Sequence, residues 1–299
     1  MTAGTTGAPA RAPFPEHLVH LVEANLGRLA VPDGDPDLAG FDEALRHPLV
    51  AGGKRLRPVL LLATVEALGG DVEAALPAAV ALECVHTFSL VHDDLPALDD
   101  DDLRRGRPTA HVVFGEDVAV LAGDALLNRA FRLLAEEQTG PAERRLTATA
   151  TLARAVDGMI RGQYLDVRPQ ADLDEAGLRR LCGLKTGCLL EAGVALALDL
   201  VAPPEATAAP YRALAAEVGL GFQIVDDVLD ATGDDATLGK RAGADAAAGK
   251  RTHVTVLGLP RARELAAASE HRATALLDAL PGRPVSLAAI VERVYRRDR

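Results

Sequence analysis

Residues 86–102 read HTFSLVHDDLPALDDDD, and this stretch does most to decide the fold. Its first half ends an apolar segment with helical spacing, which predicts a long, mostly buried helix over 74–95. Six of the ten residues that start at Asp93 are aspartates. Pro96 is expected to distort the helix where the acidic run begins, because proline removes a backbone donor and clashes with the preceding turn. That distortion allows Asp99 to turn back towards Asp93.

Two interpretations of this first aspartate cluster stay open from its residues alone. A solvated acidic loop with nonspecific affinity for cations is one. The other is a magnesium site, because Mg²⁺ prefers oxygen ligands and binds one or two carboxylates together with substrate phosphates. Arg104 and Arg105 follow the cluster, where guanidinium groups are well placed to hold diphosphate oxygens.

A second aspartate cluster lies at the end of another apolar segment, where residues 221–230 read GFQIVDDVLD. Asp226 and Asp230 are four residues apart and share one helix face, and Gln223 lies on the same side. Like charges at this spacing destabilise a helix. A bound cation explains the pair better than an exposed acidic turn does.

Lysines follow the second cluster across a loop that is rich in glycine, alanine and aspartate. They are Lys240 and Lys250. A long loop that carries basic residues is more often functional than accidental. The two acidic helix ends, each followed by cations, are more specific together than either is alone.

The rest of the chain has helical periodicity almost throughout, and no stretch shows the alternation that would predict a strand. We therefore expect an all-α protein with one domain of roughly ten helices over 15–299, preceded by a disordered tail over 1–14. The segments with helical spacing are 15–30, 58–68, 74–95, 117–137, 142–161, 173–184, 187–200, 206–231, 262–280 and 287–295.

Composition narrows the function further. The chain has 299 residues, 3% aromatic residues and no Trp, so its core is expected to consist mainly of alanine, leucine and valine. A net charge of −11 argues against a general nucleic-acid binder, which would carry a basic patch. No apolar run approaches the roughly 20 residues that span a membrane, so we expect no membrane insertion.

The three cysteines are Cys84, Cys182 and Cys188, and they show neither a CxxC pair nor a zinc-binding spacing. An odd number of cysteines and the absence of an apolar signal core at the N-terminus suggest a reducing cytosol. We therefore expect a cytoplasmic protein with buried, inert thiols.

Together these motifs resemble the polyprenyl (trans-isoprenyl) diphosphate synthases, most closely the bacterial farnesyl diphosphate synthase type. The resemblance extends from Gly52 to the C-terminus. Besides the two aspartate clusters, it is carried by GGKRLRP at 52–58, HTFSLVH at 86–92, GDAL at 123–126, GQYLD at 162–166, KTG at 185–187 and residues 233–240.

The resemblance implies an isoprenoid synthase fold with a central cavity, a homodimer, and head-to-tail condensation of isopentenyl diphosphate with an allylic diphosphate. Three Mg²⁺ ions would be held by Asp93, Asp94, Asp99, Asp226 and Asp230, with help from Asp227. The allylic diphosphate would contact Arg104, Lys185, Thr186, Gln223, Lys240 and Lys250. Isopentenyl diphosphate would contact Lys54, Arg57, His86 and Arg105.

Product length depends on the helix below the first cluster. Phe88 lies five residues before Asp93, or about 7.5 Å along a helix axis, and Ser89 is its neighbour. In the family, a bulky aromatic residue at this place resembles the pattern that stops growth at fifteen carbons. The sequence therefore predicts farnesyl diphosphate, with geranylgeranyl diphosphate as the alternative.

The chain departs from the family at two places: Arg161 stands where many relatives have glycine, and His253-Val254 stands where Tyr-Pro is common. Three other functions were weighed. A class I terpene cyclase would lack an isopentenyl diphosphate site, and a non-catalytic subunit of a heteromeric synthase would have lost aspartates that are present here. An acidic metal-buffering protein would explain neither Lys185-Thr186 nor Gln223.

Overall fold

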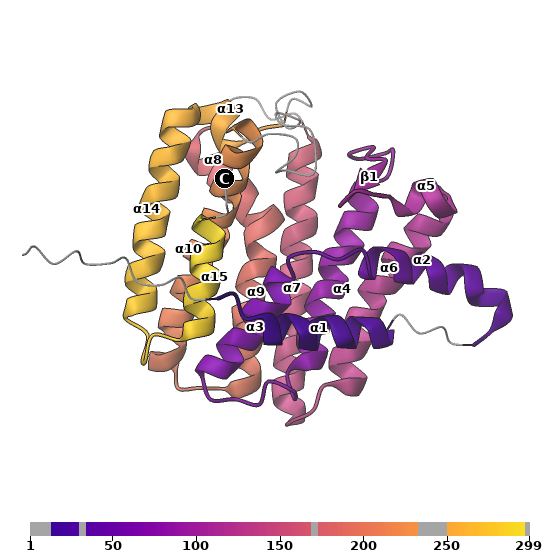
Figure 1. The fold of residues 1–299 in the computed structure, drawn as a ribbon, viewed down its shortest axis with the longest axis horizontal. Coiled ribbons are helices and arrows are strands. Elements are labelled where there is room, and N and C mark those ends of the chain that lie inside the picture. Colours follow the sequence, from indigo (N-terminus) through magenta and orange to yellow (C-terminus); the bar gives the residue numbers. More distant parts are fainter. Residues whose placement is uncertain (1–12, 30–33, 169–172, 233–249, 297–299) are drawn as a thin grey trace, which may run out of the picture.

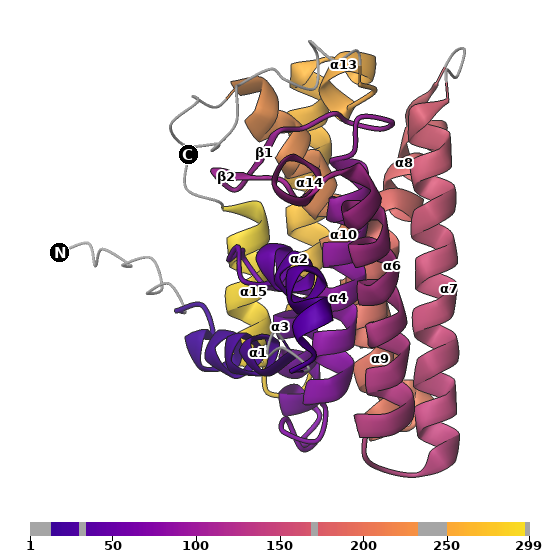
Figure 2. The same ribbon diagram turned by 90° about the vertical axis from the view of Figure 1, so that its right-hand side faces the viewer.

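The computed structural model describes residues 13–29, 34–168, 173–232 and 250–296. Figures 1 and 2 show a bundle of helices that lie roughly along one direction, with α1 and α2 crossing them on one side. The helices are α1 (Glu16–Leu29), α2 (Ala39–Leu49), α3 (Leu56–Ala67), α4 (Leu76–Asp93), α5 (Ala110–Phe114), α6 (Glu116–Arg132), α7 (Ala142–Val167), α8 (Glu175–Cys182), α9 (Cys188–Val201), α10 (Glu205–Thr232), α13 (His253–Leu257), α14 (Leu259–Asp278) and α15 (Val285–Tyr295).

The core lies where the most apolar helices meet. α4 packs against α6 and α3, and α9 packs against α7, α3 and α10. Leucine, valine and alanine make up most of the buried side chains, as the low aromatic content predicts. Small alanines let these helices approach closely, so the bundle is filled without large rings.

The all-α prediction is confirmed, and the structure corrects it in detail. Two strands of two residues each, β1 (Leu103–Arg104) and β2 (Arg107–Pro108), pair antiparallel directly after the first aspartate cluster. The expectation of no strands was therefore wrong. Period-two alternation cannot reveal strands this short. The short helices α2, α5 and α13 were also missed, since few turns leave little periodic signal.

One segment is long and apolar enough to cross a membrane. It runs from Glu175 to Val201 with a mean hydropathy of 1.6, and 61% of the tested window is buried inside the protein. The core helix of a globular domain gives the same signal. Lack of membrane insertion stays a prediction.

The two aspartate clusters lie at the same end of the bundle. α4 ends in Asp93, and the last turns of α10 carry Asp226, Asp227 and Asp230. In Figures 1 and 2, α13 and the β1–β2 hairpin lie at this end, at the top of both views. The ends of two long helices therefore present the acidic groups.

A buried cation fixes the chain at the start of α3. Arg55 has the left-handed φ of 45° and a side chain that is 0% exposed. Its Nη1 donates to Glu83 Oε1 on α4 at 2.7 Å, its Nε to Glu23 Oε1 at 2.6 Å, and its Nη2 to Leu49 O at 2.7 Å. These bonds tie α1, α2, α3 and α4 together beside Lys54 and Arg57.

Replacing Arg55 with methionine is expected to lower the free energy of unfolding by about 3–5 kcal/mol, because Glu83 is left charged and buried without its partner. Arg46→Ala serves as the control, since Arg46 and Glu43 form an exposed pair and the loss should be at most about 1 kcal/mol. Urea unfolding followed by circular dichroism measures both. Equal losses in the two variants would contradict a structural role for the buried network.

Candidate active site

A cavity of about 380 Å³ opens beside the acidic end of the bundle, between α4, α7, α10 and the turn that follows α8. Polar and apolar side chains share its wall. The polar or charged groups are Arg57, His86, Ser89, His92, Asp93, Gln163, Lys185, Thr186, Gln223 and Asp226, and the apolar groups are Phe88, Leu90, Leu98, Met159, Ile160, Leu189 and Phe222.

A second cavity of about 480 Å³ adjoins the first and shares Arg57, His86 and Phe222 with it. Its wall also contains Lys54 and Arg105, so it gathers the cations that the sequence assigned to isopentenyl diphosphate. The first cavity therefore has carboxylates beside cations, and the second has more cationic side chains than acidic ones.

The basic cavity depends on a close approach of backbone and side chain. Gly53 has a φ of +138°, and a Cβ there would lie 2.6 Å from the Arg105 guanidinium carbon. Arg105 donates to the Gly52 carbonyl. Burial lowers the pKa of His86 well below its usual value, and Arg57 and Arg105 add to this effect. His86 is therefore a neutral imidazole at pH 7.

The first aspartate cluster is folded back, as predicted. Asp99 N donates to Asp93 O at 2.8 Å, so the chain returns to the helix end. Asp93 lines the first cavity, and Asp99 Oδ2 receives Lys250 Nζ at 3.2 Å.

Asp94 has a different environment. It is 4% exposed and accepts a hydrogen bond from Arg104 Nε at 2.6 Å. It is absent from the wall of the first cavity, which contains its neighbour Asp93. Asp94 therefore holds Arg104 in this structure, and its role as a metal ligand stays a prediction.

Lys185 and Thr186 lie in a π-helical turn, η3 (Gly183–Gly187), between α8 and α9. Such turns interrupt regular helices and often occur at functional sites. Gly162 on α7 allows this turn to pass, because a Cβ there would lie 2.3 Å from Lys185 N. Lys185 forms an ion pair with Asp166 from the same α7 motif. The structure thus brings the GQYLD and KTG motifs together.

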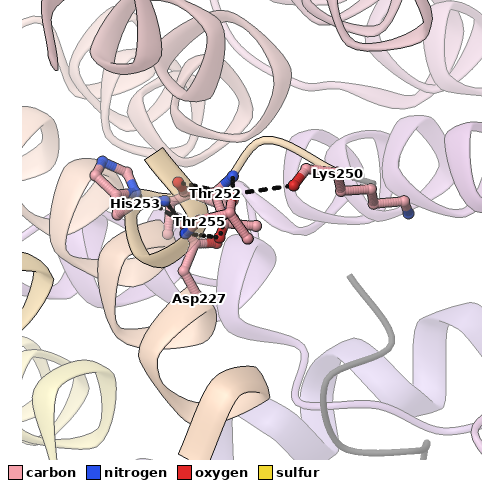
Figure 3. A network of polar contacts seen from close by, with 6 residues as sticks. Asp227, Lys250, Thr252, His253 and Thr255 are labelled. Atoms are coloured by element: carbon pink, nitrogen blue, oxygen red, sulfur yellow. Dashed lines mark hydrogen bonds and ion pairs between the residues drawn. The ribbon is translucent and has the colours of Figure 1, made fainter. Parts of the chain in front are cut away.

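In the second aspartate cluster, as in the first, one aspartate lines the cavity and the next is buried against protein groups. Asp226 lines the cavity, while Asp227 is 3% exposed and contacts Gln223 and His253. Asp230 is 4% exposed. Figure 3 shows Asp227 beside the segment from Lys250 to Thr255.

The acidic groups alone do not form a complete coordination shell for a hard cation such as Mg²⁺. Over the residues that the structure describes, no three carboxylate, imidazole or thiolate groups converge as a metal cage. Asp93, Asp99 and Asp226 nevertheless supply the oxygen donors that Mg²⁺ prefers, and Mg²⁺ commonly completes its shell with water and substrate phosphates. The donor set therefore fits Mg²⁺ bound together with a diphosphate.

Two residues need separate mention, because one prediction is untested and one residue was not predicted. Lys240 lies outside the described residues. Gln163 was quoted only as part of a motif, yet its amide lines the first cavity, and both amide atoms are buried without a hydrogen-bond partner among the described residues. Its membership in the GQYLD motif was the available signal.

The family model for polyprenyl synthetases matches residues 39–279. The chain belongs to this family. A heterodimeric geranylgeranyl pyrophosphate synthase large subunit from Arabidopsis thaliana is 46% identical over 79% of the chain and 66% of its own length. A geranylgeranyl pyrophosphate synthase from Capsicum annuum is 42% identical over 86% of the chain and 71% of its own length. The chain thus spans about two thirds of the length of these curated relatives.

Solved structures of polyprenyl synthetase relatives confirm the isoprenoid synthase fold. An FPP/GFPP synthase from Zymomonas mobilis superposes with a TM-score of 0.82 at 35% identity, covering 94% of this chain and 98% of that one. A geranylgeranyl pyrophosphate synthetase from Pyrococcus horikoshii gives 0.84 at 29% identity, covering 94% and 96%.

The relatives contradict one prediction and leave another unconfirmed. The cytoplasmic prediction is wrong by this comparison, because the similar plant enzymes are named chloroplastic. Cysteine usage indicates a reducing environment and cannot identify a compartment. The farnesyl product and the specific likeness to the bacterial farnesyl type stay predictions, because these plant relatives are named geranylgeranyl pyrophosphate synthases while the Zymomonas mobilis structure is named an FPP/GFPP synthase.

Helix geometry weakens the argument from Phe88 for a farnesyl product. At 3.6 residues per turn, Phe88 lies about 140° around α4 from Asp93, whereas Ser89 lies only about 40° away. The Phe88 ring is 7% exposed and packs edge-on against His92, with ring centroids 5.1 Å apart. The small Ser89 side chain therefore lies more directly below Asp93 than the ring does.

Divalent cation binding is expected to weaken below about pH 6. Burial raises the pKa of Asp93 to about 6, and Asp99 adds to the rise while Lys185 opposes it. The proton and the cation compete for this carboxylate, so affinity should fall by up to about tenfold per pH unit below the pKa. Electron paramagnetic resonance of free Mn²⁺ measures the binding.

Asp93→Asn provides the matched control, because it removes the titrating carboxylate and keeps the shape of the side chain. The variant should bind Mn²⁺ more weakly and with a flatter dependence on pH. A pH dependence equal to that of the wild type would exclude Asp93 as its source.

Proposed function

We propose that the chain is a prenyltransferase that joins isopentenyl diphosphate head to tail with allylic diphosphates and releases geranylgeranyl diphosphate. The observation that carries this proposal is the pair of adjoining cavities that share Arg57, His86 and Phe222. An allylic diphosphate fits beside the carboxylates of the first cavity, and isopentenyl diphosphate fits among the cations of the second. The shared wall brings the two reacting carbons together.

The first step breaks the allylic carbon–oxygen bond, which requires neutralisation of the leaving diphosphate. Asp93, Asp99, Asp226 and Asp230 would hold Mg²⁺, which would supply Lewis-acid stabilisation of that diphosphate. The chain itself contributes Lys185 on the cavity wall, with Arg104 and Lys250 held beside it by Asp94 and Asp99. Fixed cations of this kind stabilise charge as it develops.

The allylic cation must then be protected from water until the double bond of isopentenyl diphosphate attacks it. Met159, Ile160, Leu189 and Phe222 supply an apolar wall beside the polar groups. Such a wall excludes water from the reactive carbon. Diphosphate accepts the proton that is finally lost. His86 is neutral, but burial and the nearby Arg57 lower its pKa, so it is a poor acceptor for that proton.

Among the other candidates, the second cavity disfavours a terpene cyclase, which ionises its allylic substrate without an isopentenyl partner. The metal-binding aspartates disfavour a non-catalytic subunit. Residues 15–299 are proposed to act as one domain, since their described part shares one hydrophobic core.

A homodimer is proposed on the grounds of exposed apolar side chains on α5 and α6, among them Val112, Val113 and Leu121. Such a patch commonly marks a protein interface. Light scattering should give twice the chain mass of 31.2 kDa, and a monomer at micromolar concentration would exclude this interface.

The product assay combines the purified protein with isopentenyl diphosphate, geranyl or farnesyl diphosphate and Mg²⁺, and then sizes the prenyl alcohols after dephosphorylation. Twenty-carbon product is expected. Turnover of the allylic substrate without isopentenyl diphosphate would instead establish a cyclase.

Ser89→Phe should shorten the product to fifteen carbons, because the new ring would stand on the face of α4 below Asp93. Thr87→Val is the matched control: Thr87 is 3% exposed and absent from the wall of the first cavity. Twenty-carbon product from both variants would exclude this face of α4 as the element that limits chain length.

A further inference from the structure

The carboxylate of Asp227 is fully occupied by groups of the protein. Its Oδ2 accepts from the His253 backbone N–H at 2.8 Å and lies 2.6 Å from His253 Nδ1, while its Oδ1 accepts from Gln223 Nε2 at 2.7 Å. Asp227 and His253 side chains are both 2% exposed. A carboxylate can only accept, so His253 Nδ1 carries a proton in this pair.

This contact determines which way the Gln223 amide faces. Because Asp227 accepts, the nitrogen of Gln223 must point to it, and the amide oxygen is left for the cavity whose wall Gln223 helps to form. An oxygen dipole in that place favours a positive carbon. A reversed amide would present an N–H₂ group to the same space and disfavour it.

The segment that carries His253 is itself held firmly. Thr252 and Thr255 form a capping box at the start of α13, with Thr255 N donating to Thr252 Oγ1 at 3.1 Å and Thr252 N to Thr255 Oγ1 at 2.9 Å. Thr255 Oγ1 also donates to Lys250 O at 3.1 Å. Figure 3 shows these residues with Asp227 below the first turn of the helix.

The same segment reaches the other aspartate cluster. Lys250 Nζ lies 3.2 Å from Asp99 Oδ2, and His253 contacts Asp227 three residues later in the chain. Residues 250–255 therefore connect the acidic ends of α4 and α10.

We propose that His253 is a positioning residue, which holds Asp227 so that Gln223 keeps its amide oxygen directed at the allylic carbon. This inference rests on the proposed function. His253 acts through Asp227 and touches neither substrate. Its loss should slow ionisation of the allylic diphosphate and leave binding in the basic cavity unchanged.

The test compares His253→Leu with His253→Asn. The Asn side-chain nitrogen takes the place of Nδ1 and keeps the donor, whereas leucine removes it at similar volume. We expect kcat with geranyl diphosphate to fall about 10- to 100-fold in the leucine variant and to stay within about threefold of wild type in the asparagine variant. KM for isopentenyl diphosphate should change by less than about twofold in both.

A second measurement does not depend on turnover. Inorganic diphosphate with Mg²⁺ should raise the melting temperature of wild type, His253→Asn and His253→Leu equally, because it has no allylic carbon for Gln223 to face. A smaller rise in His253→Leu would show that His253 supports the diphosphate site instead and would overturn the proposal. If the leucine variant fails to fold, His253→Gln replaces it, because that amide is displaced by one methylene and should lose the same contact.

Thr255→Val controls for loosening of α13, since it removes the acceptor of Thr252 N, keeps the backbone bond from Thr255 N to Thr252 Oγ1, and changes neither Asp227 nor His253. It should lower the melting temperature while kcat stays within about threefold of wild type. Equal kcat in wild type and His253→Leu, equal losses in the Leu and Asn variants, or an equal loss in Thr255→Val would each overturn the proposal. An inactive wild type would instead overturn the proposed function.

Discussion

Charge neutralisation at one end of the helix bundle is the constraint on which the rest of the structure depends. α4 and α10 both end in carboxylates that are partly or fully buried, and a buried charge without a partner is costly. Three cations from other parts of the chain neutralise these carboxylates. Arg104 donates to Asp94, Lys250 pairs with Asp99, and Lys185 lies close enough to lower the pKa of Asp93. An incoming magnesium diphosphate would enter a site in which carboxylates and cations already alternate.

The two aspartates of each pair have separate tasks in this arrangement. Asp93 and Asp226 face the cavity, while Asp94 and Asp227 turn into the protein and hold Arg104 and, with His253, Gln223. Adjacent residues on a helix point about 100° apart, so one of each pair can face the substrate only if the other faces the scaffold. In the proposed function, each pair of aspartates thus supplies one metal ligand and one residue that holds a neighbouring side chain in place.

The long apolar helices and the acidic clusters were predictable because each extends over many residues with a recognisable pattern. The motif around Asp93 indicated the site, and the return of Asp99 followed from Pro96. The orientation of Asp94 was not predictable, because it depends on Arg104 from a hairpin of two-residue strands. The product length stays a prediction, because distance along the helix was considered without rotation around it. Ser89 lies nearer than Phe88 to the face of α4 below Asp93. The pairing of Asp227 with His253 joins residues 26 apart across a segment whose spacing carries no pattern.

The most direct test of the account is a crystal structure of the protein with Mn²⁺ and inorganic diphosphate, recorded with anomalous scattering at the manganese edge. The account predicts anomalous peaks between diphosphate and the carboxylates of Asp93, Asp99 and Asp226, with Asp227 still bound to His253. Diphosphate bound elsewhere, or manganese absent from both aspartate clusters, would contradict it.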